Sequence, residues 1–177
     1  STGVTSNGES RINTNSYILG STGKKRTEVK IVMSNLSTSM DRYTYYFGYV
    51  SSKTVLNQTD GMFFLYDEGG VSAGSTASPN WWCVCCRGGS RTFVDSGVAV
   101  KDVSLNQAQK LRIDDDGTGA SVKFYIDGSL VATITTNIPT SGAQLVNIAR
   151  IAKITGTSQR AFHIDYIEMK EKFNSPR

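Results

Sequence analysis

Aromatic and cationic side chains gather between residues 81 and 91 of this sequence, and they are its clearest candidates for contact with a ligand. Trp81 and Trp82 are adjacent, so on a β-strand they point to opposite faces of the sheet. An exposed Trp ring stacks on the apolar face of a sugar while its N–H finds a hydrogen-bond partner. Arg87 and Arg91 flank a glycine turn and are candidates for binding acidic sugars, although a solvated hairpin tip is the simpler interpretation.

Tyrosine side chains extend this candidate set. Tyr66 ends the run GMFFLY and joins the two tryptophans and two arginines as a candidate ligand-binding residue. In the run RYTYYFGYV, Tyr43, Tyr45 and Tyr49 share one face of a strand, and Tyr46 lies on the other. The alternative for every aromatic residue is burial, either in the core or beneath a loop or a neighbouring subunit.

Three consecutive carboxylates, Asp114, Asp115 and Asp116, precede a glycine-rich turn. Clustered carboxylates and loop carbonyls are ligands for calcium. The downstream Glu of a helical calcium loop is absent, so an acidic turn between strands is the preferred interpretation. Calcium remains the alternative, and no other cofactor is expected.

The cysteines Cys83, Cys85 and Cys86 lie within four residues of one another. Such closely spaced thiols cannot join distant parts of a fold by disulfides, which favours a reducing assembly compartment. On a strand Cys83 and Cys85 face one way and Cys86 the other, so the three cannot converge on zinc without a bulge. Buried, inert thiols are predicted.

The elements that must position these residues are β-strands. From Val122 to Thr136 apolar and polar side chains alternate on either side of Asp127 and Gly128, which supply the positive φ of a tight hairpin turn. Further strands are predicted over Thr27–Met33, Arg42–Val50, Gly61–Tyr66, Trp81–Arg87, Arg91–Asp95, Val98–Val103, Lys110–Asp114, Asn147–Lys153 and Ala161–Lys170. A long loop is expected over 67–80, and one helical turn is allowed within 105–110. About ten short antiparallel strands predict an all-β, two-sheet jelly-roll sandwich.

Composition and charge limit the classes of protein. The 177 residues fit one domain, 27–177, preceded by a polar segment 1–26 that serves as an attachment or an edge strand. Tyr17, Ile18 and Leu19 within it form an edge strand or a loop on the core. Ser1 is expected to mark a cleavage point or a boundary in a longer polypeptide.

The net charge of +4 is mild, and the only tight basic run, 24–26, is expected to be a solvated loop; nucleic-acid binding is therefore not predicted. No run of about 18 apolar residues exists, which excludes a transmembrane helix.

The order of several segments resembles a concanavalin A-like jelly-roll domain of bacteriophage virion surface proteins. The matching segments are WWCVCCRGG, DSGVAV, LRI, SVKFYIDGSLVAT, NIPT and RIAKITGTSQRAFHIDYI, between about Phe47 and Met169. A strand of the form W-Y/W-x-V followed by a Gly turn corresponds to residues 81–89, and an Asp-turn-Gly-Val strand to residues 95–100. The cysteines and residues 1–26 have no counterpart in this pattern.

The resemblance implies a domain of a tail fibre, tail spike or decoration protein at the virion surface, assembled in the host cytoplasm. Its expected function is non-enzymatic binding of host cell-surface polysaccharide, as a homo-oligomer in contact with other virion protein subunits and without membrane insertion. The first alternative is a purely structural virion module. The second is a polysaccharide-degrading enzyme of the same fold.

No catalytic residue is predicted. Glycoside hydrolases of the concanavalin A-like fold carry their acid and nucleophile as Glu-x-Asp-x-Glu on one strand, because residues two apart share a face. This sequence has no such run. Asp67 and Glu68 are adjacent and point to opposite faces, Glu168 and Glu171 are expected to be solvated, and the single His163 is expected to be a partly exposed strand residue.

Overall fold

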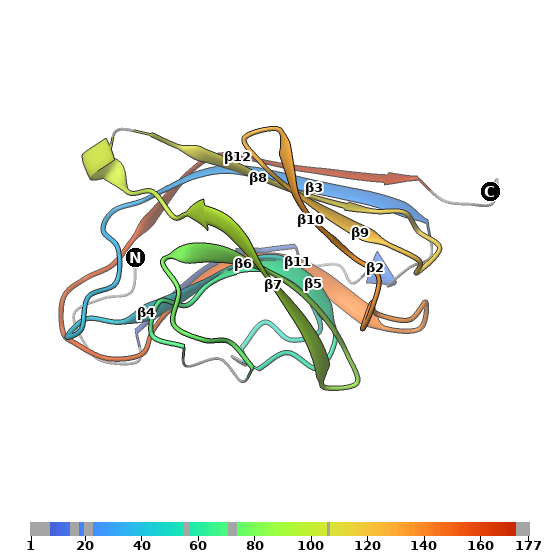
Figure 1. Cartoon of the computed structure of the whole chain (residues 1–177), viewed down its shortest axis with the longest axis horizontal. Helices are drawn as coiled ribbons and strands as arrows, with labels where there is room; N and C mark the ends of the chain where they lie inside the picture. The colour runs from blue at the N-terminus through green and yellow to red at the C-terminus, as the bar shows by residue number, and fades with distance from the viewer. Residues whose placement is uncertain are drawn as a thin grey trace.

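The computed structural model of this chain is a sandwich of two antiparallel β-sheets (Figure 1). It describes residues 8–14, 18–19, 23–54, 57–70, 74–105 and 107–172. The larger sheet has the order β1 (Glu9–Asn13), β11 (Gln144–Lys153), β4 (Tyr43–Val50), β5 (Gly61–Tyr66), β6 (Asn80–Arg87) and β7 (Ser90–Ala99), with β2 (Ile18–Leu19) also paired to β11. The smaller sheet has the order β10 (Ser129–Ile134), β9 (Val122–Ile126), β8 (Gln109–Asp115), β3 (Lys24–Met33) and β12 (Phe162–Lys172). The predicted all-β, two-sheet class is confirmed.

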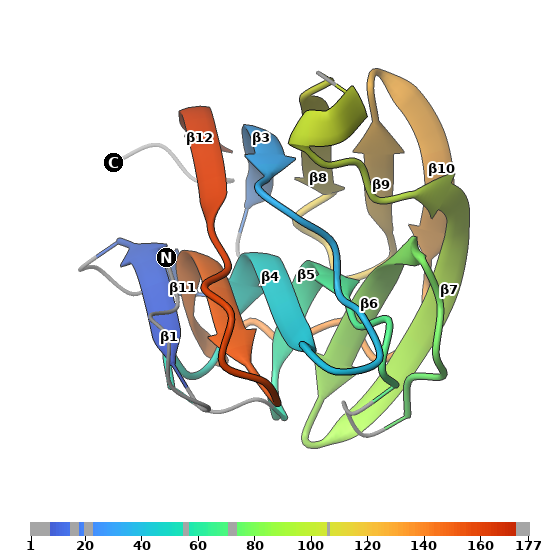
Figure 2. The same cartoon turned by 90° about the vertical axis from the view of Figure 1, so that its left-hand side faces the viewer.

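The core lies between the two sheets, because alternate residues of each strand point inward. In β3, Val29, Ile31 and Met33 are buried while the residues between them are partly exposed. The facing strands of the larger sheet contribute aromatic rings; among them Phe64 meets Phe124 edge to face, with ring centroids 5.2 Å apart. Figure 2 shows the two sheets one above the other, with β7 and β10 side by side at one margin.

A second apolar cluster lies on the outer face of the seven-stranded sheet. It contains Tyr46, Val50, Phe63, Leu65, Val84, Cys86 and Ile148, all buried, with Trp82 and Phe93 packed against them. The segments between β4 and β5 and between β5 and β6 run along this side of the molecule (Figure 1). Thr54 accepts a hydrogen bond from Arg150 through its carbonyl oxygen, and Gln58 accepts from Arg91 in the same way. The chain therefore covers this face with its own loops.

The hairpin that the sequence predicts most directly is present. Asp127 and Gly128 have φ values of 51° and 87° and join β9 to β10. The N–H of Asp127 donates to the Lys110 carbonyl at 2.8 Å, and the Asp127 carboxylate accepts from the Lys110 N–H at 2.8 Å. These bonds attach the turn to the neighbouring strand β8.

The structure differs from several predicted boundaries. Residues 24–26 lie inside β3 rather than in a solvated loop, because they pair with β8 and β12. Strand β1 lies at the edge of the larger sheet within segment 1–26, for which an edge strand was one alternative, although its bounds were not predicted. β7 is one strand from Ser90 to Ala99 because Gly97, with φ of 68°, keeps it continuous through a bend. The short helical turn is a 3-10 turn at Val103–Leu105, earlier than expected.

Parts of other predictions lie outside the described residues. These are half of segment 1–26 (residues 1–7, 15–17 and 20–22), including Tyr17, residues 71–73 of the loop expected over 67–80, and Asn106 of the expected turn. Within the part of the chain that the structure describes, no helix is long and apolar enough to cross a membrane.

Candidate functional site

The adjacent tryptophans point to opposite faces, as predicted. Trp81 lies between the sheets with 1% of its surface exposed, and its Nε1–H donates to Gln109 at 3.0 Å. Burial therefore removes Trp81 from contact with a ligand in solution, which corrects that part of the candidate set. Trp82 is half-buried on the outer face, edge to face with Phe93 at 6.1 Å, and its Nε1 is buried without a hydrogen-bond partner. Contact of Trp82 with a ligand stays a prediction.

The other three candidates from the sequence have separate surroundings. Tyr66 is buried, and its hydroxyl donates to Glu68 at 2.7 Å while accepting from the Ser37 N–H. Burial thus corrects the expectation for Tyr66. The Arg91 guanidinium donates twice to the Gln58 carbonyl, at 2.9 and 3.3 Å, and so holds a loop in place. Arg87 is exposed at the hairpin tip. The structure does not bring these five residues into one site.

The three cysteines are buried and unpaired, as predicted. Cys83 and Cys85 lie in the core between the sheets and Cys86 in the outer cluster, so they do not converge. Burial raises the pKa of all three thiols, that of Cys86 to about 12. Among the described residues, no group of three or more His, Cys, Asp or Glu side chains is arranged to hold a metal ion.

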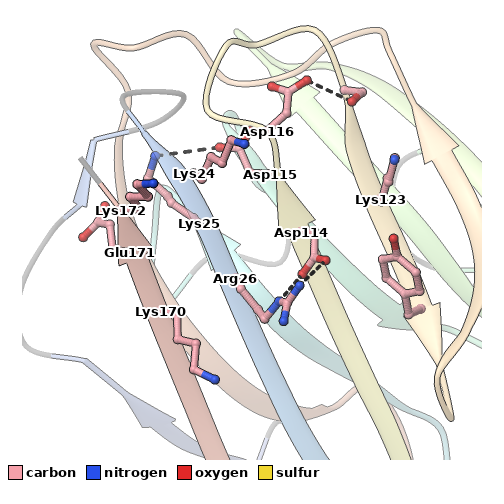
Figure 3. Close-up of a pocket in the computed structure, with 12 residues that line it drawn as sticks. Lys24, Lys25, Arg26, Asp114, Asp115, Asp116, Lys123, Lys170, Glu171 and Lys172 are labelled. Carbon is pink, nitrogen blue, oxygen red and sulfur yellow. Dashed lines mark hydrogen bonds and ion pairs between the residues drawn. The ribbon is translucent and has the colours of Figure 1, made fainter. Parts of the chain in front are cut away.

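A groove of about 410 Å³ lies at one end of the five-stranded sheet (Figure 3). Its lining comes from β3, β8, β9 and β12 and from the turn after β8. The lining residues are Lys24, Lys25, Arg26, Asp114, Asp115, Asp116, Ser121, Lys123, Tyr125, Lys170, Glu171 and Lys172. All three carboxylates of the predicted calcium alternative are therefore in this groove.

The three aspartates have different partners and point in different directions. Asp114 is on the outer face and accepts two hydrogen bonds from Arg26, at 2.8 and 2.9 Å. Asp115 points inward and lies 3.7 Å from the Lys25 ammonium. Asp116 accepts from Thr118 and from the Ser121 hydroxyl. Burial would raise the pKa of Asp116, but these hydrogen bonds outweigh it and lower the pKa. The calcium hypothesis stays untested, and this arrangement gives it no support.

The inner end of the groove is an ion pair closed off from water. The side chains of Lys25 and Asp115 are both 0% exposed. Lys25 also donates to the Gly23 carbonyl at 3.0 Å, and Asp115 accepts from the Gly117 N–H at 3.0 Å. Burial raises the pKa of Asp115 despite these favourable contacts. This pair fixes β3 to β8 beneath the groove.

The outer rim of the groove carries an aromatic ring, one face of which is covered by Arg112, and charged side chains without a partner among the described residues. Tyr125 is half-buried, and the Arg112 guanidinium lies over its ring at 3.8 Å from the centroid. Lys24, Lys123 and Lys172 are exposed, and none makes a hydrogen bond or ion pair with a described residue. The site therefore offers a ring for stacking, hydroxyl and carboxylate acceptors, and ammonium donors.

Sequence reasoning found only part of this groove. The outward positions of Lys123 and Tyr125 and the basic run 24–26 were visible as patterns. Their meeting depends on the pairing of β12 with β3, β3 with β8 and β8 with β9, which joins segments up to 148 positions apart. No local pattern encodes that pairing.

Comparison with known proteins identifies a family and confirms the fold. The family model described as SO2946-like, C-terminal domain, matches residues 1–165. No curated protein matches this chain. The crystal structure of the Emp47p carbohydrate recognition domain is 13% identical, with a TM-score of 0.64, covering 96% of this chain and 81% of that one. The potassium-bound Emp46p carbohydrate recognition domain is 9% identical, with a TM-score of 0.62, covering 95% and 80%.

A glycoside hydrolase shares the same architecture. The Bacteroides ovatus mixed linkage glucan GH16 protein, in complex with a G4G4G3G product, is 12% identical with a TM-score of 0.57, covering 90% of this chain and 74% of that one. Identities this low show the fold alone. They confirm the concanavalin A-like sandwich, which hosts both binding domains and enzymes.

Proposed function

This chain belongs to the SO2946-like, C-terminal domain family, and we propose that it binds a polysaccharide without cleaving it. The observation that carries the proposal is the open groove on the five-stranded sheet. It sets the half-buried Tyr125 ring among exposed hydrogen-bonding side chains on neighbouring strands. Sugars are recognised by such combinations, because a ring covers their C–H faces while polar groups bind their hydroxyls.

The fold adds support of a general kind. Two of the similar structures are described as carbohydrate recognition domains. The third is a GH16 protein, so the absence of catalysis has to be argued from this chain. The sequence lacks the Glu-x-Asp-x-Glu run. Asp114 and Asp115 in the groove face lysine or arginine side chains, and Asp116 accepts hydrogen bonds from its own turn. Because these carboxylates already have partners within the protein, they favour binding over catalysis as the function of the groove.

The biological setting of the proposal comes from the sequence resemblance. The segments shared with phage virion domains suggest a host cell-surface polysaccharide as the ligand, on a virion surface and within an oligomer. Several weak sites on one particle would then act together. The structural alternative is less favoured, because the apolar cluster outside the seven-stranded sheet is already buried by the chain's own loops.

The test is titration of the purified protein with neutral glycans (dextran and cello-oligosaccharides) and with polygalacturonate, by calorimetry. Tyr125→Ala should weaken binding by about tenfold or more because it removes the stacking surface. Tyr125→Phe should retain most of the affinity, and Trp82→Ala serves as the matched aromatic control on the other sheet. Loss in Trp82→Ala with retention in Tyr125→Ala would move the site away from the groove. No binding to any glycan, even by a multimerised protein, would overturn the proposal.

A further inference from the structure

The groove holds an excess of unneutralised positive charge. Of its four carboxylates, Asp114 and Asp115 are paired with Arg26 and Lys25. Asp116 accepts three hydrogen bonds from residues 118–121, which leaves Glu171 as the carboxylate without a described partner. Lys24, Lys123 and Lys172 are likewise unpaired within the described chain, and Lys170 contacts the exposed Glu168 at 2.9 Å. Asp116 keeps its negative charge, because its donors are neutral groups and its pKa is lowered, so three ammonium groups without a described anionic partner face two carboxylates without a described cationic partner.

The position of two of these lysines contradicts what sheet stability alone would favour. Lys24 and Lys172 are directly opposite each other on β3 and β12, and the next outward pair along these strands is Arg26 opposite Lys170. Like charges in directly opposite positions destabilise a sheet. Departures from local rules of this kind are expected at functional sites, where a ligand supplies the missing partner.

The spacing of the cations fits an extended ligand. Lys24 and Lys172 are on neighbouring strands, and Lys123 lies on β9, across β8 from β3 (Figure 3). Neighbouring strands are about 4.8 Å apart, so Lys123 is separated by roughly two strand spacings from Lys24 and by roughly three from Lys172. A chain with anionic groups at intervals can contact all three lysines without requiring their side chains to converge on one point.

The remaining polar groups of the groove help to decide which class of polymeric anion it can bind. Asp116 accepts a hydrogen bond from Ser121, two positions before Lys123 in the chain, and Glu171 directly precedes Lys172. A nucleic acid carries a charge at every phosphate. A sugar chain carries its anionic groups together with several hydroxyls on its rings, and these hydroxyls can donate to the groove carboxylates.

We propose that the groove is a site for an acidic polysaccharide, in which Lys24 and Lys172 bind one carboxylate or sulfate, Lys123 binds the next, and a sugar ring on the far side of Lys123 from the lysine pair stacks on Tyr125. This inference rests on the proposed function and adds the chemical class of the ligand. Arg26 is a positioning residue, because both of its hydrogen bonds to Asp114 hold the centre of the groove in shape.

The experiment compares polygalacturonate, dextran sulfate, neutral dextran and a single-stranded DNA oligonucleotide as probes, at 50 and 300 mM NaCl. The wild-type protein should bind the two acidic glycans, more weakly at the higher salt concentration, and neutral dextran at least tenfold more weakly. Lys24→Gln/Lys172→Gln should lose about tenfold or more in affinity for the acidic glycans. The control Arg87→Gln/Lys101→Gln removes the same charge elsewhere and should bind as the wild type does. Unfolding midpoints check that all variants are folded.

The other possible outcomes distinguish a failure of the acidic ligand class from a failure of the proposed function. Equal binding of neutral and acidic glycans, unchanged in Lys24→Gln/Lys172→Gln but lost in Tyr125→Ala, would overturn the anionic class and keep the proposed function. DNA binding as tight as glycan binding would show a general affinity for polyanions and overturn the inference. An equal loss in the control double variant would show that net charge, and not this groove, is responsible.

Discussion

The ion pair between Lys25 and Asp115 is the residue-scale feature that connects the groove to the core. Both side chains are fully buried, and they lie 3.7 Å apart. A buried pair adds little net stability, because desolvation offsets the attraction, but losing one partner leaves an uncompensated charge. The groove therefore depends on both residues being present together.

Asp115→Asn should lower the free energy of unfolding by about 3–5 kcal/mol, because it leaves the Lys25 ammonium buried without its anion. The amide still accepts from the Gly117 N–H, so backbone contacts are preserved. Lys25→Met/Asp115→Asn should recover most of the loss, as measured by urea unfolding. Asp114→Asn is the matched control on the exposed face, where an ion pair contributes about 1 kcal/mol or less. Equal, small losses in Asp115→Asn and Asp114→Asn would contradict this account.

At the scale of residues, the sequence predicted which face of a strand a side chain occupies better than it predicted which side chains form a site. Strand alternation correctly separated Trp81 from Trp82 and Cys85 from Cys86. It could not tell which tryptophan is inside, because both faces of the seven-stranded sheet are covered, one by the other sheet and one by loops. The burial of Tyr66 could not be predicted for the same reason, so it was taken as available for contact with a ligand.

At the scale of elements, the Asp41 carboxylate links the segment before β4 to the segment before β12. Asp41 accepts from the Ser158 N–H at 3.0 Å and from its hydroxyl at 2.8 Å, and Arg160 lies 3.7 Å away. The Ser158 N–H, followed by its hydroxyl, lowers the pKa of Asp41 below its usual value of 3.8. The ionised form is therefore favoured by folding.

This contribution to stability is present above pH 3.8 and is lost as the pH falls through the lowered pKa of the folded state. Asp41→Asn should accordingly unfold at a lower temperature than the wild type at pH 7, and the two proteins should converge as the pH falls below 3.8 and through the lowered pKa. Thermal unfolding followed by circular dichroism measures both curves. A gap that stays constant with pH would show that Asp41 acts through its shape and not through its charge.

The strands themselves were largely predictable, and the exceptions have physical reasons. The hairpin at Asp127 and Gly128 was found because its turn chemistry is local. An edge strand was one alternative for segment 1–26, but the position of β1 could not be located because ESRIN lacks the apolar alternation of a half-buried strand; Ile12 in it is 52% exposed. The run 24–26 looked like a loop because lysine is rarely buried, whereas Lys25 is accommodated by Asp115.

At the scale of the whole molecule, the two sheets have different outer faces. The seven-stranded sheet is covered by its own loops, and all eight residues of β4 are buried. The five-stranded sheet is open, and its outward residues are mostly charged. The sequence predicted two sheets, but not this difference, because the order of strands in each sheet is set by long-range pairing.

The buried thiols should report on unfolding of the whole molecule. Cys83 and Cys85 lie in the core, and Cys86 lies in the outer cluster. Their raised pKa values and burial predict that the folded conformation itself does not react with a thiol reagent. All three should react readily in denaturant; without denaturant they should react only through global unfolding, and therefore at one common slow rate. Labelling is followed by mass spectrometry. Faster reaction of Cys86 alone would show that the covering loops open independently of the sandwich.

The alternation of β3, β8 and β9 has a consequence for how such a domain changes over generations. On these strands each outward residue of the groove has, as its immediate neighbours in the chain, residues that face the core. Substitutions at Lys24, Lys123 or Tyr125 therefore exchange recognition groups while the packing beneath remains as it was. Ligand preference and foldability are encoded by interleaved but separate sets of positions. A library that randomises only the outward set should yield folded proteins with new specificities, and selection in nature has the same freedom.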